Sequence, residues 1–215
     1  DVRYLKKGME IDLTVLGEKH TLCTNLNGRF QSMNISAAVL AAYKAGVPIK
    51  KIISSFSSPV TVPGRLEKVY EGNYTVYIDY AHTPDALQRT LQTVREFTKG
   101  RIITVFGCGG NRDHEKRPVM GKIASDISDI AIVTSDNPRY ENPDVIIREI
   151  IEGIKGNNLI VIPDRREATG KAISMAGDGD VVIIAGKGHE NYQETDGVKY
   201  PYSDRETVMN LTGGM

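Results

Sequence analysis

From about residue 64 onward, short apolar runs alternate with helix-forming stretches, and this pattern restricts the fold more than any other feature. The runs are continuous, so both faces of each predicted strand are apolar. Strands of this kind occur in parallel sheets that helices cover on both sides. We therefore predict an α/β fold with a mainly parallel, Rossmann-like sheet and helices on both faces. The predicted strands span residues 75–78, 101–106, 130–133, 159–162 and 181–185.

Helix start signals lie between these runs. Thr83 before Pro84 suits an N-cap followed by the first helical position. Isoleucines at i, i+3, i+4 and i+7 follow Asn142-Pro143 and share one helix face. Two later segments have the spacing of a capping box, Asp164-x-x-Glu167 and Ser203-x-x-Glu206. A further helix is predicted around residues 119–125.

The first 62 residues differ in character. Near-alternating runs over residues 11–16 and 20–23 predict strands, and a helix is predicted over 30–45, closed by Gly46. Residues 54–63 are rich in Ser, Pro and Val and are interpreted as a linker. We therefore predict two domains, 1–62 and 63–215. An additional antiparallel edge strand is suggested over 198–200, after the Asp196-Gly197 turn.

Composition excludes several function classes. The 215 residues contain 27 Lys+Arg and 27 Asp+Glu, so no net field favours nucleic acid or an anionic membrane. Two cysteines without CxxC spacing cannot form a disulfide framework, which favours a reducing cytoplasm. No apolar stretch is long enough to cross a bilayer. We expect a cytoplasmic monomer, and the abrupt start indicates a fragment.

Unusual residues follow four of the predicted strands. Ligands of open parallel sheets bind outside the carboxyl ends of the strands. The segments at these ends are Asp79-Tyr80-Ala81-His82, Gly107-Cys108-Gly109-Gly110-Asn111-Arg112-Asp113, Ser135-Asp136-Asn137-Pro138-Arg139 and Gly186-Lys187-Gly188-His189-Glu190. The loops at the opposite edge are plain turns. This asymmetry predicts a site for a small charged substrate, with Asp136-Asn137-Pro138-Arg139 at its centre.

Each segment also has a purely structural interpretation. Glycines after a strand permit a tight turn, and Asp-Asn-Pro favours a turn and a helix entry. Gly186-Lys187-Gly188 lacks the P-loop spacing and is open to interpretation as a mobile loop with a surface lysine. Cys108 has no base placed beside it by sequence, so a nucleophile is disfavoured. His20 and His114 are interpreted as exposed polar residues, and no paired His or Cys spacing indicates a metal.

The ordered motifs together resemble the Mur ligase family. They are Pro63-Gly64-Arg65, Asp79-Tyr80-Ala81-His82-Thr83-Pro84, Phe106-Gly107-Cys108-Gly109-Gly110-Asn111-Arg112-Asp113, Lys116-Arg117-Pro118, Asp136-Asn137-Pro138-Arg139, Gly186-Lys187-Gly188-His189-Glu190-Asn191-Tyr192-Gln193 and Tyr202-Ser203-Asp204-Arg205. The resemblance implies a three-domain cytoplasmic ligase of peptidoglycan synthesis. ATP would phosphorylate the carboxylate of UDP-MurNAc-L-Ala-D-Glu, and the amine of an amino acid would attack the acyl phosphate. Residues 1–62 would end the central ATP-binding domain, and 63–215 would form the amino-acid-binding domain.

The resemblance to the diaminopimelate-adding members also implies the substrate contacts. The remote carbon of meso-diaminopimelate carries both a carboxylate and an ammonium. Guanidinium groups suit the carboxylate and Glu190 suits the ammonium. The implied contacts are Arg112, Asp136, Asn137, Pro138, Arg139, Gly186 and Glu190. A lysine-adding ligase is the first alternative, against which Arg139 argues, and a non-catalytic amino-acid-binding module is the second.

For ATP, the resemblance implies Asn34 at the adenine, Arg65 at the phosphates, and Asp79 with His82 near the ribose. Asn34 as a solvent-facing residue and Asp79 as a stabiliser of its own turn are the structural alternatives. The P-loop, the modified lysine and most Mg²⁺ ligands of the family would lie upstream of residue 1. We therefore assign no catalytic or metal-binding residue here and expect the fragment alone to be inactive.

Overall fold

The computed structural model describes residues 1–5, 8–26, 28–58 and 61–213. Its contacts divide the chain into two compact units, Asp1–Val62 and Pro63–Met215, which are considered separately. Within the described residues, no helix combines the length and the apolar character needed to cross a membrane.

The first unit is a small antiparallel sheet packed against two helices. Its core joins Met9, Ile11 and Leu22 of the sheet to Ile35, Val39 and Ile52 of the helices. The predicted strands and the long helix are present. The strand β1 and the helix α2 were not predicted. Helix α2 includes the first two residues of the linker predicted over 54–63. Residues 59 and 60 of that linker lie outside the described residues. The elements are β1 (Val2–Leu5), β2 (Gly8–Val15), β3 (Glu18–Thr24), α1 (Arg29–Lys44) and α2 (Ile49–Ser55).

The second unit has the predicted α/β architecture. A six-stranded sheet has the order β4-β5-β9-β6-β7-β8, and every neighbouring pair except β4–β5 is parallel. Its strands are β4 (Glu67–Glu71), β5 (Thr75–Asp79), β6 (Ile102–Phe106), β7 (Ile130–Val133), β8 (Leu159–Val161) and β9 (Val181–Ala185). Its helices are α3 (Pro84–Phe97), α4 (Lys116–Ile127), α5 (Pro143–Ile151), α6 (Arg165–Met175) and α7 (Asp204–Leu211). The strands β10 (Tyr192–Thr195) and β11 (Val198–Pro201) form a separate hairpin.

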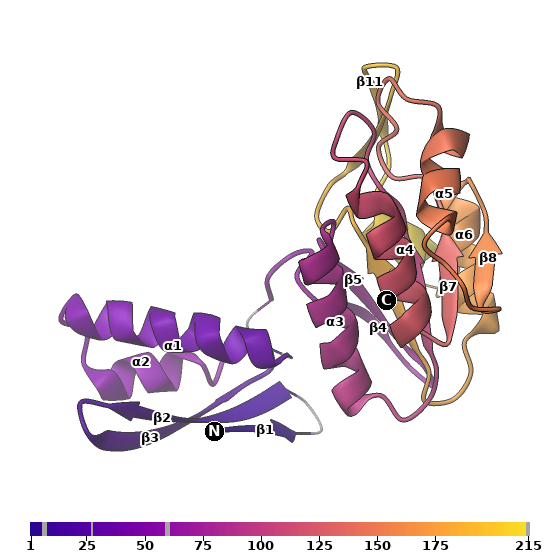
Figure 1. Ribbon diagram of the computed structural model, residues 1–215. Coiled ribbons are helices and arrows are strands. Elements are labelled where there is room, and N and C mark those ends of the chain that lie inside the picture. The colour runs from indigo at the N-terminus through magenta and orange to yellow at the C-terminus, as the bar shows by residue number, and fades with distance from the viewer. Residues whose placement is uncertain (6–7, 27, 59–60, 214–215) are drawn as a thin grey trace. The chain divides into compact units, whose positions relative to one another are not determined.

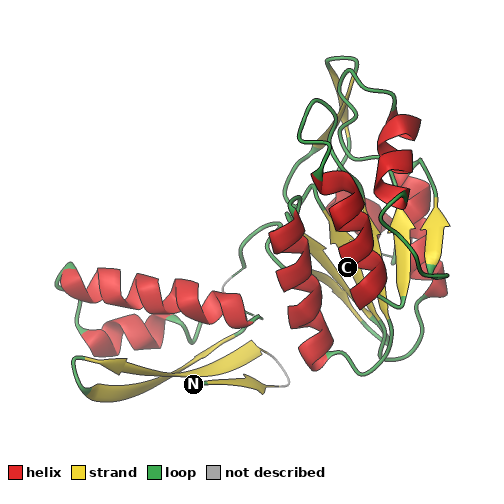
Figure 2. Ribbon diagram, in the orientation of Figure 1, coloured by secondary structure: helices red, strands yellow, loops and turns green. Residues whose placement is uncertain are grey.

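Helices cover both faces of this sheet. Figures 1 and 2 show α3, α4 and α5 on one face, where Leu91, Phe106 and Ile150 belong to one buried cluster. The opposite face packs against α6 and α7, with Ala172 and Val208 in a second cluster. The apolar strands are therefore buried on both sides, as their uninterrupted pattern predicts.

The predicted helix caps are confirmed. The side chains of Thr83, Asn142, Asp164 and Ser203 each accept a hydrogen bond from a backbone N–H in the first turn. An N-cap side chain satisfies one of the four orphan donors at a helix start. The caps thus determine where the helices α3, α5, α6 and α7 begin.

The antiparallel edge strand was predicted in the wrong place. The strand at the edge of the sheet is β4, which precedes β5, whereas residues 198–200 belong to β11 of the hairpin. The turn itself is confirmed: Asp196 and Gly197 both have positive φ, as a type I′ turn requires. Figure 1 shows the hairpin beyond the carboxyl ends of the strands, at the same edge as the predicted site.

Candidate functional site

Four strand-end loops surround one pocket of about 450 Å³. The strand β9 is inserted between β5 and β6, so the loop after β9 lies between the loops that follow those two strands. The pocket is lined by Tyr80, His82, Thr83, Gly107, Cys108, Gly109, Arg112, Asp113, Lys116, Asp136, Asn137, Arg139, Gly186 and Glu190. The structure thus brings together most of the residues that sequence analysis proposed for the substrate.

Asn137 is the central hydrogen-bonding residue of the pocket. Its side-chain oxygen accepts from Lys187 Nζ at 2.8 Å and from the backbone N–H of Glu194 at 2.9 Å. Its amide nitrogen donates to Glu190 Oε2 at 2.9 Å. These contacts use the side chain of Asn137 to join the loops after β7 and β9 and the hairpin. The residue therefore holds the pocket together, whatever it offers to a ligand.

Lys187 is fully buried, which contradicts the alternative interpretation of a surface lysine on a mobile loop. Its ammonium group lies 3.1 Å from Glu190 Oε2 as well as contacting Asn137. A buried charge requires a partner, and Glu190 provides it. Glu190 Oε2 therefore receives two donors from the protein, while its other oxygen has no hydrogen bond within the described residues and lies on a residue that lines the pocket.

Arg139 reaches the pocket from a left-handed backbone conformation, with φ of 53°. Its backbone N–H donates to the Glu194 carbonyl at 3.0 Å, and its carbonyl accepts from the backbone of Asp196. In the guanidinium, Nη1 donates to the Gly110 carbonyl at 2.8 Å, and Nε lies 3.5 Å from the Glu194 carboxylate. Part of the guanidinium remains available at the pocket, where Arg139 is half-buried.

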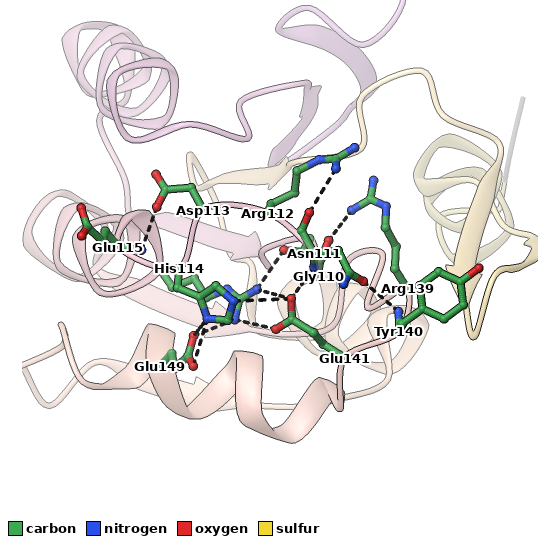
Figure 3. A network of polar contacts seen from close by, with 12 residues as sticks. Gly110, Asn111, Arg112, Asp113, His114, Glu115, Arg139, Tyr140, Glu141 and Glu149 are labelled. Carbon is green, nitrogen blue, oxygen red and sulfur yellow. Dashed lines mark hydrogen bonds and ion pairs between the residues drawn. The ribbon is translucent and has the colours of Figure 1, made fainter.

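Arg112 belongs to the neighbouring loop after β6 and is exposed. Its Nη1 donates to the carbonyl of Asn111, the residue before it, at 3.1 Å. Figure 3 shows Arg112 and Arg139 extending from these two loops, and both side chains line the pocket. Two guanidinium groups on one pocket favour an anionic ligand group such as a carboxylate or a phosphate.

Asp136 lines the pocket from a nearly buried position. Its Oδ2 lies 3.8 Å from Nη1 of Arg165, which is itself fully buried. Asp204 accepts from Arg165 Nε and Nη2, both at 2.8 Å. Burial opposes the charge of Arg165, but the nearby carboxylates outweigh it and raise its pKa. Gly186 lies against Asp136: its φ is 116°, and a Cβ there would stand 2.6 Å from Asp136 Oδ2.

Pro138, also predicted as a substrate contact, is not among the residues that line the pocket. It is buried, its carbonyl accepts the backbone N–H of Glu141, and the pocket lining passes from Asn137 to Arg139. Proline restricts the backbone of its own residue and of the one before it. Pro138 therefore shapes the loop behind the lining.

Among the predicted ATP residues, Asp79 accepts hydrogen bonds from segments outside its own turn. Its Oδ2 accepts from the backbone N–H of Leu66 at 2.6 Å, and Oδ1 accepts from Thr90 at 3.1 Å. Burial raises the pKa of Asp79 in spite of these bonds. Each oxygen of the buried Asp79 carboxylate thus already accepts one hydrogen bond from the protein.

The other predicted ATP residues are exposed. His82 lines the pocket, and its carbonyl accepts from Lys116 Nζ at 2.8 Å. The guanidinium of Arg65 lies 5.0 Å from the ring centroid of Tyr80, a pocket residue. Asn34 belongs to the first unit, where it lies exposed on α1 and donates to Gln31 at 3.3 Å.

Cys108 is buried, and burial raises the pKa of its thiol to about 12. Only the thiolate is a strong nucleophile, so the raised pKa lowers the reactivity of this thiol near neutral pH. His114 is exposed but contacts Glu149, and His20 is half-buried, contrary to the exposed position predicted for it. Within the described residues, no group of three or more His, Cys, Asp or Glu side chains is arranged to hold a metal ion.

Sequence analysis assigned no role to three polar residues at this site. Lys116, Arg117 and Lys187 all lie within motifs that were recognised, and for Lys187 a surface position was the alternative interpretation. Arg117 is fully buried and pairs with Glu141 and Glu149 at 2.9 and 2.6 Å. The spacing of Lys187 and Glu190, three residues apart, was the one available signal of an ion pair. Nothing in the local sequence indicated that Arg117 would meet acids from the next helix and its preceding loop.

The fold and pocket define an α/β domain whose strand-end loops enclose a pocket lined by both acidic and basic side chains. A family model described as Mur ligase, glutamate ligase domain, matches residues 64–188, so the chain belongs to the Mur ligase family. A UDP-N-acetylmuramoyl-L-alanyl-D-glutamate–2,6-diaminopimelate ligase from Aquifex aeolicus (strain VF5) is 49% identical over 209 residues, covering 97% of this chain and 43% of that protein.

Solved structures agree with this assignment. The structure of a UDP-N-acetylmuramoyl-L-alanyl-D-glutamate–2,6-diaminopimelate ligase matches with a TM-score of 0.73 and 37% identity. The match covers 99% of this chain and 44% of that chain. A Mycobacterium tuberculosis folylpolyglutamate synthase complexed with ADP and AMPPCP has a TM-score of 0.75 at 19% identity, covering 100% and 47%, and shows likeness of fold alone. The chain thus spans less than half the length of these relatives.

Proposed function

We propose that this chain is the amino-acid-binding part of an ATP-dependent ligase that adds meso-diaminopimelate to UDP-MurNAc-L-Ala-D-Glu. The observation that carries the proposal is the pocket in which two arginines, Arg112 and Arg139, and three acids, Asp113, Asp136 and Glu190, converge from three loops. The relatives named as diaminopimelate ligases support the choice of substrate. The remote end of meso-diaminopimelate carries one carboxylate and one ammonium, which this combination of charges complements.

In this proposal the pocket binds the remote end of the amino acid. Arg112 and Arg139 pair with the carboxylate, for which planar guanidinium groups are well suited. Glu190 accepts from the ammonium through the oxygen that the protein leaves unpaired, and Asp136 adds a second negative charge. The Asn137 side chain, held by Lys187, maintains the position of Glu190. Lysine has the ammonium but lacks the carboxylate, and would leave both arginines without a partner.

The remaining reaction steps are proposed for the longer protein. The carboxylate takes the γ-phosphoryl group of ATP and releases ADP. The amine at the other end of the bound amino acid then attacks the acyl phosphate, which forms the amide bond and releases inorganic phosphate and a proton. Binding and orienting the amine nucleophile is the contribution of residues 63–215, because orientation lowers the entropic part of the barrier. Arg65, exposed beside Tyr80, suits the phosphates, and His82 suits another part of the nucleotide. Mg²⁺ would accompany ATP in the longer protein, and no residue of this chain is proposed as its ligand.

Calorimetry with meso-diaminopimelate and L-lysine tests the proposal. Wild-type chain should bind diaminopimelate more tightly than lysine. Arg139→Ala should weaken diaminopimelate binding by about 10- to 100-fold, since a hydrogen bond to a charged group contributes about 1.5–3 kcal/mol. Arg89→Ala serves as the matched control, because Arg89 is exposed on α3 and pairs with Asp85. Equal binding of the two amino acids to wild type would favour the lysine-adding alternative and refute the proposed substrate.

A further inference from the structure

The two arginine loops of the pocket are tied to each other by hydrogen bonds outside the pocket lining. Asn111 Oδ1 accepts from the backbone N–H of Tyr140 at 3.1 Å, and the backbone N–H of Asn111 donates to Glu141 Oε1. The backbone N–H of Gly110 donates to the Asn137 carbonyl at 2.9 Å. Figure 3 shows the contacts of Asn111 with Tyr140 and Glu141. The two loops therefore form one hydrogen-bonded body.

The tied residues are the immediate neighbours of the two pocket arginines. Asn111 precedes Arg112, while Tyr140 and Glu141 follow Arg139. A displacement of either loop along the tie would change the spacing between the two guanidinium groups. Since bidentate recognition of a carboxylate depends on that spacing, the tie bears directly on the ligand that the pocket accepts.

The hydrogen bonds between the two loops also hold an unfavourable backbone conformation in place. Asn111 and Arg139 both have φ in the left-handed region, 51° and 53°. Asparagine tolerates this region, but arginine adopts it only where the surrounding structure holds it there. The bonds to Tyr140 and Glu141 act directly after Arg139, and those from Glu194 and Asp196 act on Arg139 itself.

Glu141 connects this tie to the buried Arg117. Its two oxygens accept from Arg117 Nη1 and Nη2 at 2.9 and 3.1 Å. Arg117 Nη2 also donates to the Gly109 carbonyl at 3.3 Å, which anchors the glycine loop to α4. One carboxylate thus links the loop of Arg112, the loop of Arg139 and a fully buried cation on a helix.

We infer that Glu141 is a positioning residue that sets the distance between Arg112 and Arg139, and so gives the pocket its preference for a ligand with a remote carboxylate. This inference rests on the proposed function. Glu141 does not line the pocket and acts through the two arginines. Loss of its charge would leave both guanidinium groups in place but no longer at a defined spacing.

Glu149 provides a matched control. It lies on α5, pairs with the same Arg117 at 2.6 Å and also contacts His114. Its side chain is 28% exposed and that of Glu141 is 18% exposed, so the two are similarly placed relative to water. Through His114, Glu149 reaches the loop that carries Arg112, but within the described structure it makes no hydrogen bond to the loop that carries Arg139, so it does not link the two loops as Glu141 does.

The experiment is calorimetry of the 215-residue chain with meso-diaminopimelate and L-lysine, comparing wild type, Glu141→Gln and Glu149→Gln. Glu141→Gln should weaken diaminopimelate binding by about tenfold and leave lysine binding within about twofold, because lysine has no group for the two arginines. Glu149→Gln should change neither. In an Arg139→Ala background, Glu141→Gln should cause little further loss, since the two act as one unit.

Thermal unfolding of each variant separates positioning from folding. Should Glu141→Gln unfold below the assay temperature, Asn111→Gly is the second variant: it keeps the left-handed backbone and removes only the bond to Tyr140. It should weaken diaminopimelate binding selectively and by less than Glu141→Gln. Suppose that wild type prefers diaminopimelate and that Glu141→Gln folds and keeps the same preference. This result would overturn the inference about Glu141 but leave the proposed function standing. Wild type without that preference would refute the proposed function and the inference with it.

Discussion

Two fully buried arginines lie on opposite faces of the same sheet, and their partners differ in access to water. Arg165 on α6 pairs with Asp204, whose side chain is also fully buried. Arg117 on α4 pairs with Glu141 and Glu149, which remain partly exposed. Removal of a partner leaves an unpaired buried charge in the first cluster. In the Arg117 cluster, water can reach the carboxylates of Glu141 and Glu149. The comparison indicates that one cluster stabilises the fold and the other organises the edge of the pocket.

The largest effect is expected at Asp204. Asp204→Asn removes the carboxylate that accepts from Arg165 Nε and Nη2 and from the Tyr202 hydroxyl. An uncompensated buried charge typically costs about 3–5 kcal/mol, so the free energy of unfolding should fall by that amount. Urea denaturation at pH 7 measures it. A loss below about 1 kcal/mol would mean that Asp136, 3.8 Å away, already neutralises Arg165.

A smaller effect is expected at Arg117, and it should depend on pH. Arg117→Met keeps an apolar stem and leaves two carboxylates that water can reach, so a loss of about 1–3 kcal/mol is expected at pH 7. Hydrogen bonds from Arg117 lower the pKa of Glu141 and of Glu149 from the ordinary 4.5.

The sign of the pH dependence follows from these lowered pKa values. A carboxylate with a lower pKa in the folded state stabilises the fold above its unfolded pKa, and the contribution is lost as pH falls through the folded value. The gap between wild type and Arg117→Met should therefore be constant from neutral pH to about 4.5 and shrink below it. Urea midpoints from pH 7 to pH 3 measure this gap, and a gap that grows on acidification would contradict the assignment.

The smallest effect sharpens the comparison by testing the helices that carry the two clusters. Asp164 caps α6, which begins with Arg165, and Asn142 caps α5, which carries Glu149. Asp164→Ala and Asn142→Ala should each lower the free energy of unfolding by about 1 kcal/mol. Similar losses would show that the clusters differ through burial of charge. A much larger loss for Asp164→Ala would instead attribute the difference to the stability of α6 itself.

Much of the site was predictable because its residues follow strands that are recognisable from sequence. The apolar runs predicted five parallel strands, and polar residues after four of them predicted one edge of the sheet as the site. Asn137, Arg139 and Glu190 therefore met in the pocket as expected. Their roles were less predictable. The partners of Asn137 are 50 or more residues away in sequence, at Lys187, Glu190 and Glu194.

Local patterns by themselves determined the α/β class, the capped helix starts and the set of loops that form the site, because these depend on neighbours within a few residues. The tertiary structure alone decided the strand order, the burial of Lys187 and Arg117, and the hydrogen bonds that Asp79 accepts from Leu66 and Thr90. The physical reason is that a charged side chain is buried only where a partner from a distant segment offsets its loss of water. Such partners become neighbours only after β9 inserts between β5 and β6.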